Sequence, residues 1–401
     1  MEKTEFIENN KKVKIVIGNG FDLHCGLMSS YGNYFEYYEA KYNYIKSWIQ
    51  KYSGNLVAKR FFGPTLLDCW EPFDKFDEVN VWDLFFEIIT DDSQLKEKAR
   101  WCDIEEEILF SLVIPSIDGI NVKKQPICWK DVYSIINGEK KFENKTFNFI
   151  ALSAFVFKKH GGLLFEDENS FYEFLLNELR KFEINFGKYL KRQHDYFDHF
   201  INHHNADYDM KAAETISSLG EDSSLVSIDS FNFGTFNNEK YDAILRRING
   251  TLDMPIFGID STVFKSDDVR FIFSKTNRRM EMDMIVHNAS IEPSFNNVVV
   301  YGHSLNKSDY SYFFPLLDKL EMTDFTSNMT IVFAFTIYKQ DQSYQIKQAH
   351  RKAIQELFSA YAIFKGYQTN PERLLDSLTT QGRIVSCELP LLDGVPSYFW
   401  N

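Results

Sequence analysis

The stretch that decides the fold is residues 13–32, VKIVIGNGFDLHCGLMSSYG. It opens with a short, β-branched apolar run that stops at a Gly-Asn-Gly turn, which is typical of a buried parallel strand. A short helix over residues 21–25 is expected to follow the turn. A strand, a glycine turn and a helix in this order predict an α/β protein with a parallel sheet.

The turn itself has two interpretations. Gly18 and Gly20 would let the backbone approach a ligand closely, and amides at a helix N-terminus favour a phosphate. Asp22 follows at a position suited to hold a ribose hydroxyl or a water. The stretch matches only the first part of the dinucleotide fingerprint, because Leu23 stands at the third glycine position. A tight strand-to-helix turn without a ligand explains the same residues.

Composition limits the classes of function. The 401 residues are 44% hydrophobic and 16% aromatic, which fits a large core with helices packed through rings. The net charge of −13 argues against broad contact with a nucleic acid backbone, because such contact needs a positive face. No apolar run reaches the ~20 residues of a membrane span, and the polar start does not resemble a signal peptide. We therefore expect a cytoplasmic protein without a membrane partner.

Metal and disulfide chemistry receive little support. The five cysteines are scattered without a C-x-x-C pair, which predicts reduced thiols. His199 and His203 have the i, i+4 spacing of metal ligands, but no H-E-x-x-H frame accompanies them, so a polar helix end is favoured. No metal is expected.

The pattern along the chain predicts an α/β core interrupted by a helical insertion. The core is expected at residues 11–52 and 221–390, and the insertion at residues 53–220. The longest helical pattern lies at residues 171–201, where apolar residues recur at steps of three or four. Strands are predicted at residues 225–228, 255–260, 297–301, 329–336 and 383–387. Helices are predicted at residues 309–320, capped by Ser308, and at residues 343–361.

Three of these predicted strands end in small or polar residues. Asn232 comes after the first, Asp260 ends the second, which Asn249 and Gly250 precede, and Gly302, His303 and Ser304 come after the third. Ligands of open parallel sheets bind outside the carboxyl ends of the strands. The spacing is therefore compatible with one shared site.

An ordered set of short motifs now resembles the AbiH family of bacteriophage abortive infection proteins. The motifs are G-N-G-F-D-L at 18–23, W-x-D-x-E at 101–105, S-F-N-F at 230–233, I-N-G at 248–250, I-F-G-I-D at 256–260, F-S-K-T at 273–276 and Y-G-H-S-L-x-x-x-D at 301–309. Their arrangement is more remotely similar to sirtuin-like nucleotide-binding domains. The resemblance implies a Rossmann-like, mostly parallel sheet with a large helical insertion.

The resemblance also implies a site. Its cofactor-binding residues would be Gly18, Asn19, Gly20, Phe21, Asp22, Gly302, Ser304 and Asp309, and its catalytic residues Asn232, Asn249, His303 and Asp22. The sequence departs from the related pattern at Asn249, which stands where related chains have histidine. Because asparagine cannot exchange a proton near neutral pH, a general base is lost there. His24 or His303 would have to compensate, and either also fits a structural role.

Four further charged residues are candidates to support an anionic ligand: Asp260, Lys275, Arg278 and Arg279. An arginine pair such as the last two is more often simply solvated.

The implied function is an antiphage protein that binds, and in one interpretation hydrolyses, NAD or a related nucleotide as a glycohydrolase. One alternative is a nucleotide sensor or interaction module without turnover. The other is a metal-dependent nuclease using Asp103, Glu105 and Glu106. The acidic net charge and the missing basic stripe disfavour this alternative, and nucleic acid is not an expected partner. A homo-oligomer or a defence partner protein stays open.

Overall fold

The computed structural model describes residues 12–44, 47, 79–83, 86, 104–105, 108–109, 112, 168–200, 208–220, 225–234, 243–281, 293–367 and 370–390. The chain forms two compact units. The first comprises residues 1–30, 187–256 and 279–401, and the second residues 31–186 and 257–278. Among the described helices, none combines the length and the apolar character needed to cross a bilayer.

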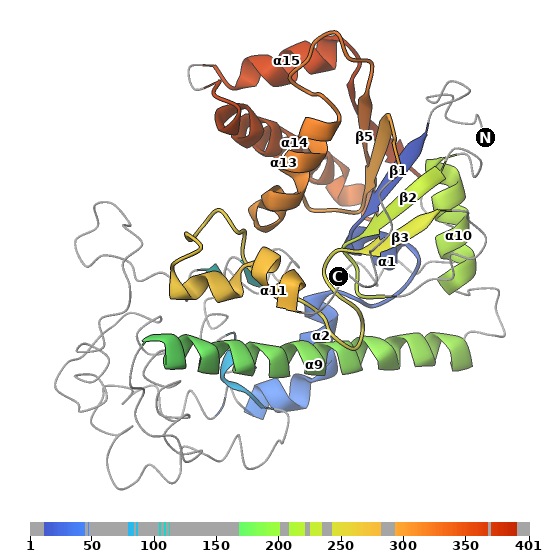
Figure 1. The fold of residues 1–401 in the computed structure, drawn as a ribbon. Helices are drawn as coiled ribbons and strands as arrows, with labels where there is room; N and C mark the ends of the chain where they lie inside the picture. The colour runs from blue at the N-terminus through green and yellow to red at the C-terminus, as the bar shows by residue number, and fades with distance from the viewer. Residues whose placement is uncertain are drawn as a thin grey trace, which may run out of the picture. The chain divides into compact units, whose positions relative to one another are not determined.

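The first unit is built on a six-stranded, all-parallel sheet (Figure 1). Its strands are β1 (Val13–Ile17), β2 (Leu225–Ser230), β3 (Ile244–Arg247), β4 (Asn297–Tyr301), β5 (Thr330–Thr336) and β6 (Ile384–Leu389). They lie in the order β3-β2-β1-β4-β5-β6, with Ile15 opposite both Ile228 and Val299. This is the Rossmann order, which reverses direction between β1 and β4. The predicted α/β, Rossmann-like parallel sheet is confirmed.

Helices cover both faces of this sheet, which explains why all five residues of β1 are buried. Val13, Ile15 and Ile17 pack in one cluster with α10 (Tyr208–Leu219). Val16, on the opposite face, belongs to the cluster of α13 (Tyr310–Lys319), α14 (Ser343–Phe364) and α15 (Glu372–Thr380). Alternate residues of a strand point to opposite faces, so a strand covered on both faces is largely apolar, and a charged residue such as Lys14 in β1 needs a buried partner.

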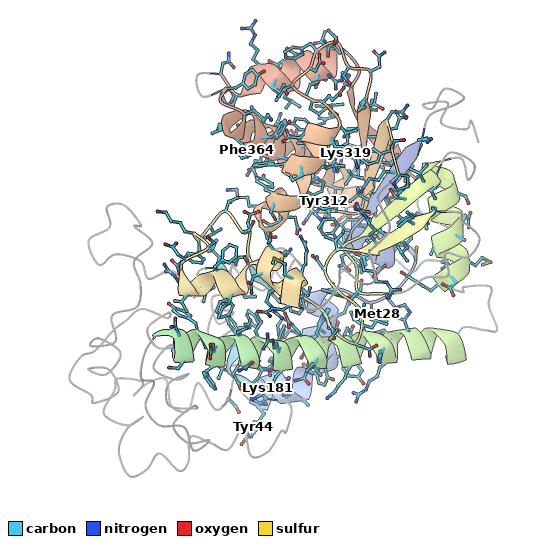
Figure 2. The ribbon with its side chains drawn as sticks, in the orientation of Figure 1. Met28, Tyr44, Lys181, Tyr312, Lys319 and Phe364 are labelled. Atoms are coloured by element: carbon cyan, nitrogen blue, oxygen red, sulfur yellow. The ribbon has the colours of Figure 1, made fainter. Side chains whose placement is uncertain are left out.

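A buried charge network crosses three strands beneath α13. The Lys14 ammonium lies 2.5 Å from the Asp229 carboxylate, and both side chains are at most 1% exposed. Arg246, directly opposite Asp229 in the β2–β3 register, donates to both carboxylate oxygens, at 2.8 and 2.5 Å. The Tyr312 hydroxyl, labelled in Figure 2, donates to the same carboxylate at 2.5 Å. The Arg246 and Lys14 contacts hold the pKa of Asp229 below its ordinary value despite its burial.

Two sequence predictions are wrong in this region. Residues 255–260 form no strand and make only isolated bridges, between Gly250 and Pro255 and between Ile259 and Ser274. The third strand in sequence is instead β3. Two of its four residues are arginines, so it shows no apolar pattern, and it forms with Arg246 paired to Asp229. Ser308 does not cap α13, because it lies in the 3₁₀ helix η3 (Lys307–Asp309) and Asp309 occupies the cap position.

Aromatic rings form the core of the second unit. Its elements include α2 (Tyr31–Tyr37), the 3₁₀ helix η2 (Val269–Phe273) and the first part of α9 (Glu168–Phe200), while α11 (Lys275–Glu281) begins in this unit. The Tyr34 ring contacts Phe182 and Phe186, and both of these contact Phe257, with ring centroids 5.2–5.8 Å apart. The structure therefore accounts for part of the chain's high aromatic share.

The remaining described elements are short or peripheral. They are α1 (Asn19–His24), which follows β1, and the 3₁₀ helix η4 (Gln340–Gln342), which precedes α14. Helix α1 buries Phe21 against the same face of the sheet as α10. It thereby places the residues after the first glycine turn at the carboxyl edge of β1.

Candidate functional site

Two glycine turns meet at the carboxyl ends of β1 and β4, where the strand order reverses. The Gly18 amide donates to the Tyr301 carbonyl at 3.0 Å, and the Gly20 amide donates to the Gly302 carbonyl at 2.8 Å. A Cβ on Gly20 would lie 2.7 Å from the Gly302 Cα. Gly302 has a φ of +67°, and a Cβ there would lie 2.3 Å from the Phe21 nitrogen. These glycines therefore allow two backbones to touch, and the Gly20 amide already has a protein acceptor.

The other residues expected to bind a cofactor lie around these turns in different environments. The Asn19 amide oxygen accepts a hydrogen bond from the Ser29 hydroxyl at 2.5 Å, while Phe21 is fully buried in the sheet core. Ser304 is exposed, and Asp309 is buried. The structure therefore brings Gly18, Gly20 and Gly302 into direct contact, with Asn19 and Phe21 between the first turn and α1.

Asp22 and Asn232 come together on the β2 side of the first turn. The Asn232 side-chain NH₂ donates to the Gly18 carbonyl at 3.0 Å and to Asp22 Oδ1 at 2.9 Å. The Tyr208 hydroxyl, from α10, donates to the same carboxylate oxygen at 2.7 Å. Burial raises the pKa of Asp22 to about 7, although both hydrogen bonds act to lower it. Near neutral pH the carboxyl is thus present in both protonation states.

The amide oxygen of Asn232 is an acceptor without a donor among the described residues. The orientation of the Asn232 side-chain amide is fixed, because its NH₂ group must face the Gly18 carbonyl and the Asp22 carboxylate oxygen that it contacts. The Oδ1 atom is buried and has no hydrogen-bond partner in the described part of the chain. Since buried polar atoms are nearly always hydrogen-bonded, this oxygen is suited to accept a bond from a bound hydroxyl or N–H group.

His194 and Gly234 complete this group, and sequence reasoning did not place either in the site. The position that a Cβ on Gly234 would occupy lies 3.1 Å from His194 Nε2 and 3.3 Å from Asp22 Oδ2. The His194 ring packs edge-on against Tyr208, with centroids 5.1 Å apart. The glycine two residues after Asn232 was the available signal, because only a residue without Cβ leaves both side chains undisturbed.

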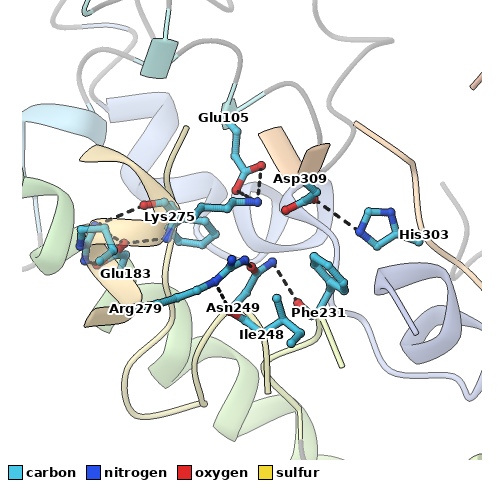
Figure 3. A network of polar contacts seen from close by, with 11 residues as sticks. Glu105, Glu183, Phe231, Ile248, Asn249, Lys275, Arg279, His303 and Asp309 are labelled. Atoms are coloured by element: carbon cyan, nitrogen blue, oxygen red, sulfur yellow. Dashed lines mark hydrogen bonds and ion pairs between the residues drawn. The ribbon is translucent and has the colours of Figure 1, made fainter. Parts of the chain in front are cut away.

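His303 and Asn249 are both occupied by protein contacts (Figure 3). The Leu305 amide donates to His303 Nδ1 at 2.9 Å, and Nε2 lies 3.4 Å from Asp309. The Asn249 NH₂ group donates to the Phe231 carbonyl at 3.3 Å. Both imidazole nitrogens of His303 therefore have partners within the protein.

Arg279 holds the loop that carries Asn249. Its Nη2 donates to the Asn249 side-chain oxygen at 3.3 Å, and its Nε donates to the Ile248 carbonyl at 2.8 Å (Figure 3). The side chain of Asn249 thus accepts one hydrogen bond and donates another within the protein. In this arrangement it organises the loop after β3.

His24 lies in an apolar environment at the end of α1. It is 2% exposed, and its ring packs edge-on against Tyr301 at 5.5 Å. Burial, together with the charge of Lys211, lowers the pKa of His24 to about 4, so the imidazole is neutral at pH 7. Burial also raises the pKa of the neighbouring Cys25 thiol, which is therefore not a ready nucleophile.

The predicted anion-binding cations of the second unit already have counter-ions. Lys275 lies 2.8 Å from Glu105, and Arg278 lies 2.7 Å from Glu183, with all four side chains at most 4% exposed. Asp260 accepts hydrogen bonds from the Thr262 amide and hydroxyl. These charges neutralise one another inside the second unit.

The nuclease interpretation gains no support from the described residues. Glu105 faces Lys275, and Asp103 and Glu106 lie outside the part of the chain that the structure describes, as do the side chains of His199 and His203. Within the described ranges, no group of three or more histidine, cysteine, aspartate or glutamate side chains is arranged to hold a metal ion.

Comparison with known proteins identifies a family. The family model described as bacteriophage abortive infection AbiH matches residues 15–334, which include most of β1, all of β2 to β4 and most of β5. No curated protein and no solved structure matches the chain.

Proposed function

The chain belongs to the AbiH family of bacteriophage abortive infection proteins, and on that premise we propose that its first unit binds NAD or a related nucleotide at the carboxyl edge of the sheet. Abortive infection is the role that the family carries. The nucleotide site is our inference from the residues beside the first glycine turn. It fits the place where Rossmann-like sheets bind ligands.

The buried oxygen of Asn232 carries this proposal. Because its NH₂ group is already engaged, Asn232 offers a ligand only an acceptor. A ribose hydroxyl can donate to that oxygen, whereas an ionised phosphate has no proton to give. The adjacent Asp22 carboxyl also disfavours a phosphate and favours a donor. We therefore assign the ribose, rather than the phosphates, to Asn232 and Asp22.

Hydrolysis of the nicotinamide glycosidic bond is one form of this function. Its transition state resembles an oxocarbenium ion, so the protein has to orient the ribose, hold negative charge near it and admit water. Asp22 would supply the charge and Asn232 the orientation. The step breaks the bond between the ribose carbon and the nicotinamide nitrogen, and water adds to that carbon while its proton leaves.

A sensor without turnover is the second form, and two observations favour it. Asn249 carries an amide, which takes up no proton near neutral pH, and both nitrogens of His303 are engaged by Leu305 and Asp309. Neither residue is thus an available general base. Binding would then change the conformation or the partners of the protein without consuming the nucleotide.

The test combines binding with product analysis. Purified protein is titrated with NAD by calorimetry, and the same samples are assayed for free nicotinamide. Asn232→Ala should weaken NAD binding by about 5- to 150-fold, since a buried hydrogen bond is worth about 1–3 kcal/mol. Asn297→Ala is the matched control, because Asn297 is equally buried but lies at the amino end of β4.

The outcomes separate the interpretations. Nicotinamide release that Asn232→Ala abolishes indicates a hydrolase, and binding without release indicates a sensor. If the wild-type protein binds no NAD, or if Asn232→Ala and Asn297→Ala bind it equally well, the proposed site is wrong. Circular dichroism of each variant shows whether a lost signal reflects unfolding.

A further inference from the structure

We propose that His194, on α9, is a further positioning residue of this site, where it pairs with the Asp22 carboxyl across Gly234 and sets whether that carboxyl is charged when the ribose binds. The proposal rests on the proposed function, because it concerns the same ligand. It adds a residue that neither the motifs nor the family resemblance indicated.

Geometry brings the two side chains within reach of each other. His194 Nε2 and Asp22 Oδ2 flank one point, the position of a Cβ on Gly234, at 3.1 and 3.3 Å. They are therefore separated by no more than the sum of these distances, 6.4 Å. An imidazolium at such a distance from a carboxylate favours the charged form of both groups.

Tyr208 fixes the arrangement from the side. Its hydroxyl donates to Asp22 Oδ1 at 2.7 Å, and its ring packs edge-on against the His194 ring at 5.1 Å. One side chain of α10 therefore contacts both members of the pair. With Asn232 donating to the same Oδ1, the second carboxylate oxygen is the one directed to the side of His194.

The other titratable groups around Asp22 cannot take up this role near neutral pH. From α10, Tyr208 has a pKa raised by burial, and Lys211 is a cation that acts on the neighbouring residues of α1. From α1, Cys25 is held as a thiol and His24 as a neutral imidazole. Among the described residues that face Asp22, His194 is thus the group that can gain a proton as the carboxyl loses one.

The pairing predicts how the site responds to pH. When His194 is protonated, its charge favours an ionised Asp22, which accepts hydrogen bonds from ribose hydroxyls most strongly. When His194 is neutral, burial favours the protonated carboxyl, which offers a poorer acceptor. The affinity for the ribose should therefore depend on the state of the pair as a unit.

The first experiment needs no ligand. Histidine resonances are followed by NMR against pH in the full-length protein, and His194→Gln identifies the signal of His194. Asp22→Asn should lower the pKa of His194 by about half a unit or more, because it removes the neighbouring negative charge. Asp309→Asn is the matched control, since this carboxyl contacts His303 instead and its loss should leave the pKa of His194 unchanged.

The second experiment measures the NAD affinity of the wild type, His194→Gln and His350→Gln across the same pH range. His194→Gln should shift the dependence of the affinity on pH to higher pH, because without the imidazolium charge the Asp22 carboxyl ionises only at a higher pH. His350→Gln, on α14, should leave the profile unchanged. An unchanged His194 pKa in Asp22→Asn, or an unchanged pH profile in His194→Gln, overturns the inference. A wild type that binds no NAD refutes the proposed function instead, and the ligand-free titration still decides whether the two side chains are paired.

Discussion

Replacing Asp22 with asparagine should change the way in which the free energy of unfolding depends on pH. The asparagine oxygen can still accept the bonds from Tyr208 and Asn232, so the variant mainly removes the charge. In the wild type, burial raises the pKa of Asp22 from 3.8 to about 7. Between these values the unfolded chain releases a proton that the folded chain keeps, and stability therefore falls as the pH rises.

The size of the effect follows from the shift. Each pH unit well inside the window is worth about 1.4 kcal/mol, so the wild type should lose about 3 kcal/mol through Asp22 between pH 5 and pH 8. Above about pH 8 the contribution is constant, because the carboxyl is then ionised in both the folded and the unfolded state. Asp22→Asn removes this pH-dependent contribution. The free energy of unfolding of the variant should therefore rise relative to that of the wild type by about 3 kcal/mol from pH 5 to pH 8.

His24 provides a control of opposite sign. Burial lowers its pKa from 6.5 to about 4, so in this interval the unfolded chain holds a proton that the folded chain lacks. Its contribution to stability is lowest below the folded pKa and rises with pH up to about 6.5. In the wild type the two residues therefore oppose each other, and His24→Asn should shift the pH dependence in the direction opposite to Asp22→Asn.

The assay is unfolding in guanidinium chloride from about pH 5 to about pH 8. Pulsed hydrogen–deuterium exchange of the peptide that contains β1 measures the unfolded fraction, so that the signal reports on the first unit. Each variant is compared with the wild type at the same pH, which cancels groups that are unchanged. If the stability curves of Asp22→Asn and the wild type run parallel from pH 5 to pH 8, the carboxyl is not held near a neutral pKa, and our reasoning about the site is refuted.

Three further predictions concern buried contacts. Asp229→Asn removes the carboxylate charge that faces the buried Lys14 ammonium and should destabilise the first unit by about 3–5 kcal/mol in denaturant unfolding. A loss below about 1 kcal/mol would contradict the network. Gly302→Ala should destabilise the first unit by at least about 2 kcal/mol and lower its melting temperature, because the new Cβ would clash with the backbone nitrogen of Phe21 at a residue with positive φ. An unchanged melting temperature would show that the two turns do not touch. Arg278→Met leaves the Glu183 carboxylate unpaired and should speed proteolysis of the second unit, whereas equal cleavage rates would argue against the pair.

The central strands were predictable because their signals are local. β1, β2, β4 and β5 each carry several apolar or β-branched residues, as expected of strands buried on both faces. The exceptions Lys14 in β1 and Asp229 in β2 are paired with each other. β3 gave no such signal, since its four residues include two arginines. It forms because Arg246 meets Asp229 across the sheet, which is a contact between residues distant in sequence.

The glycine turn shows the limit of motif reasoning at the site. A G-x-G sequence indicates that something approaches the backbone closely, but a ligand and another loop make the same demand on the residue type. Here the neighbour of Gly20 is Gly302, which lies 282 positions later in the chain. The roles assigned to the two turns in nucleotide binding stay predictions.

The sequence by itself determined the fold class, the family and the placement of Asp22 and Asn232 after neighbouring strands, because apolar periodicity and ordered motifs are properties of the chain alone. Tertiary structure decided which groups surround Asp22. Tyr208 and His194 reach it from α10 and α9, and its pKa is set by desolvation, which depends on everything packed around the carboxyl rather than on its neighbours in sequence.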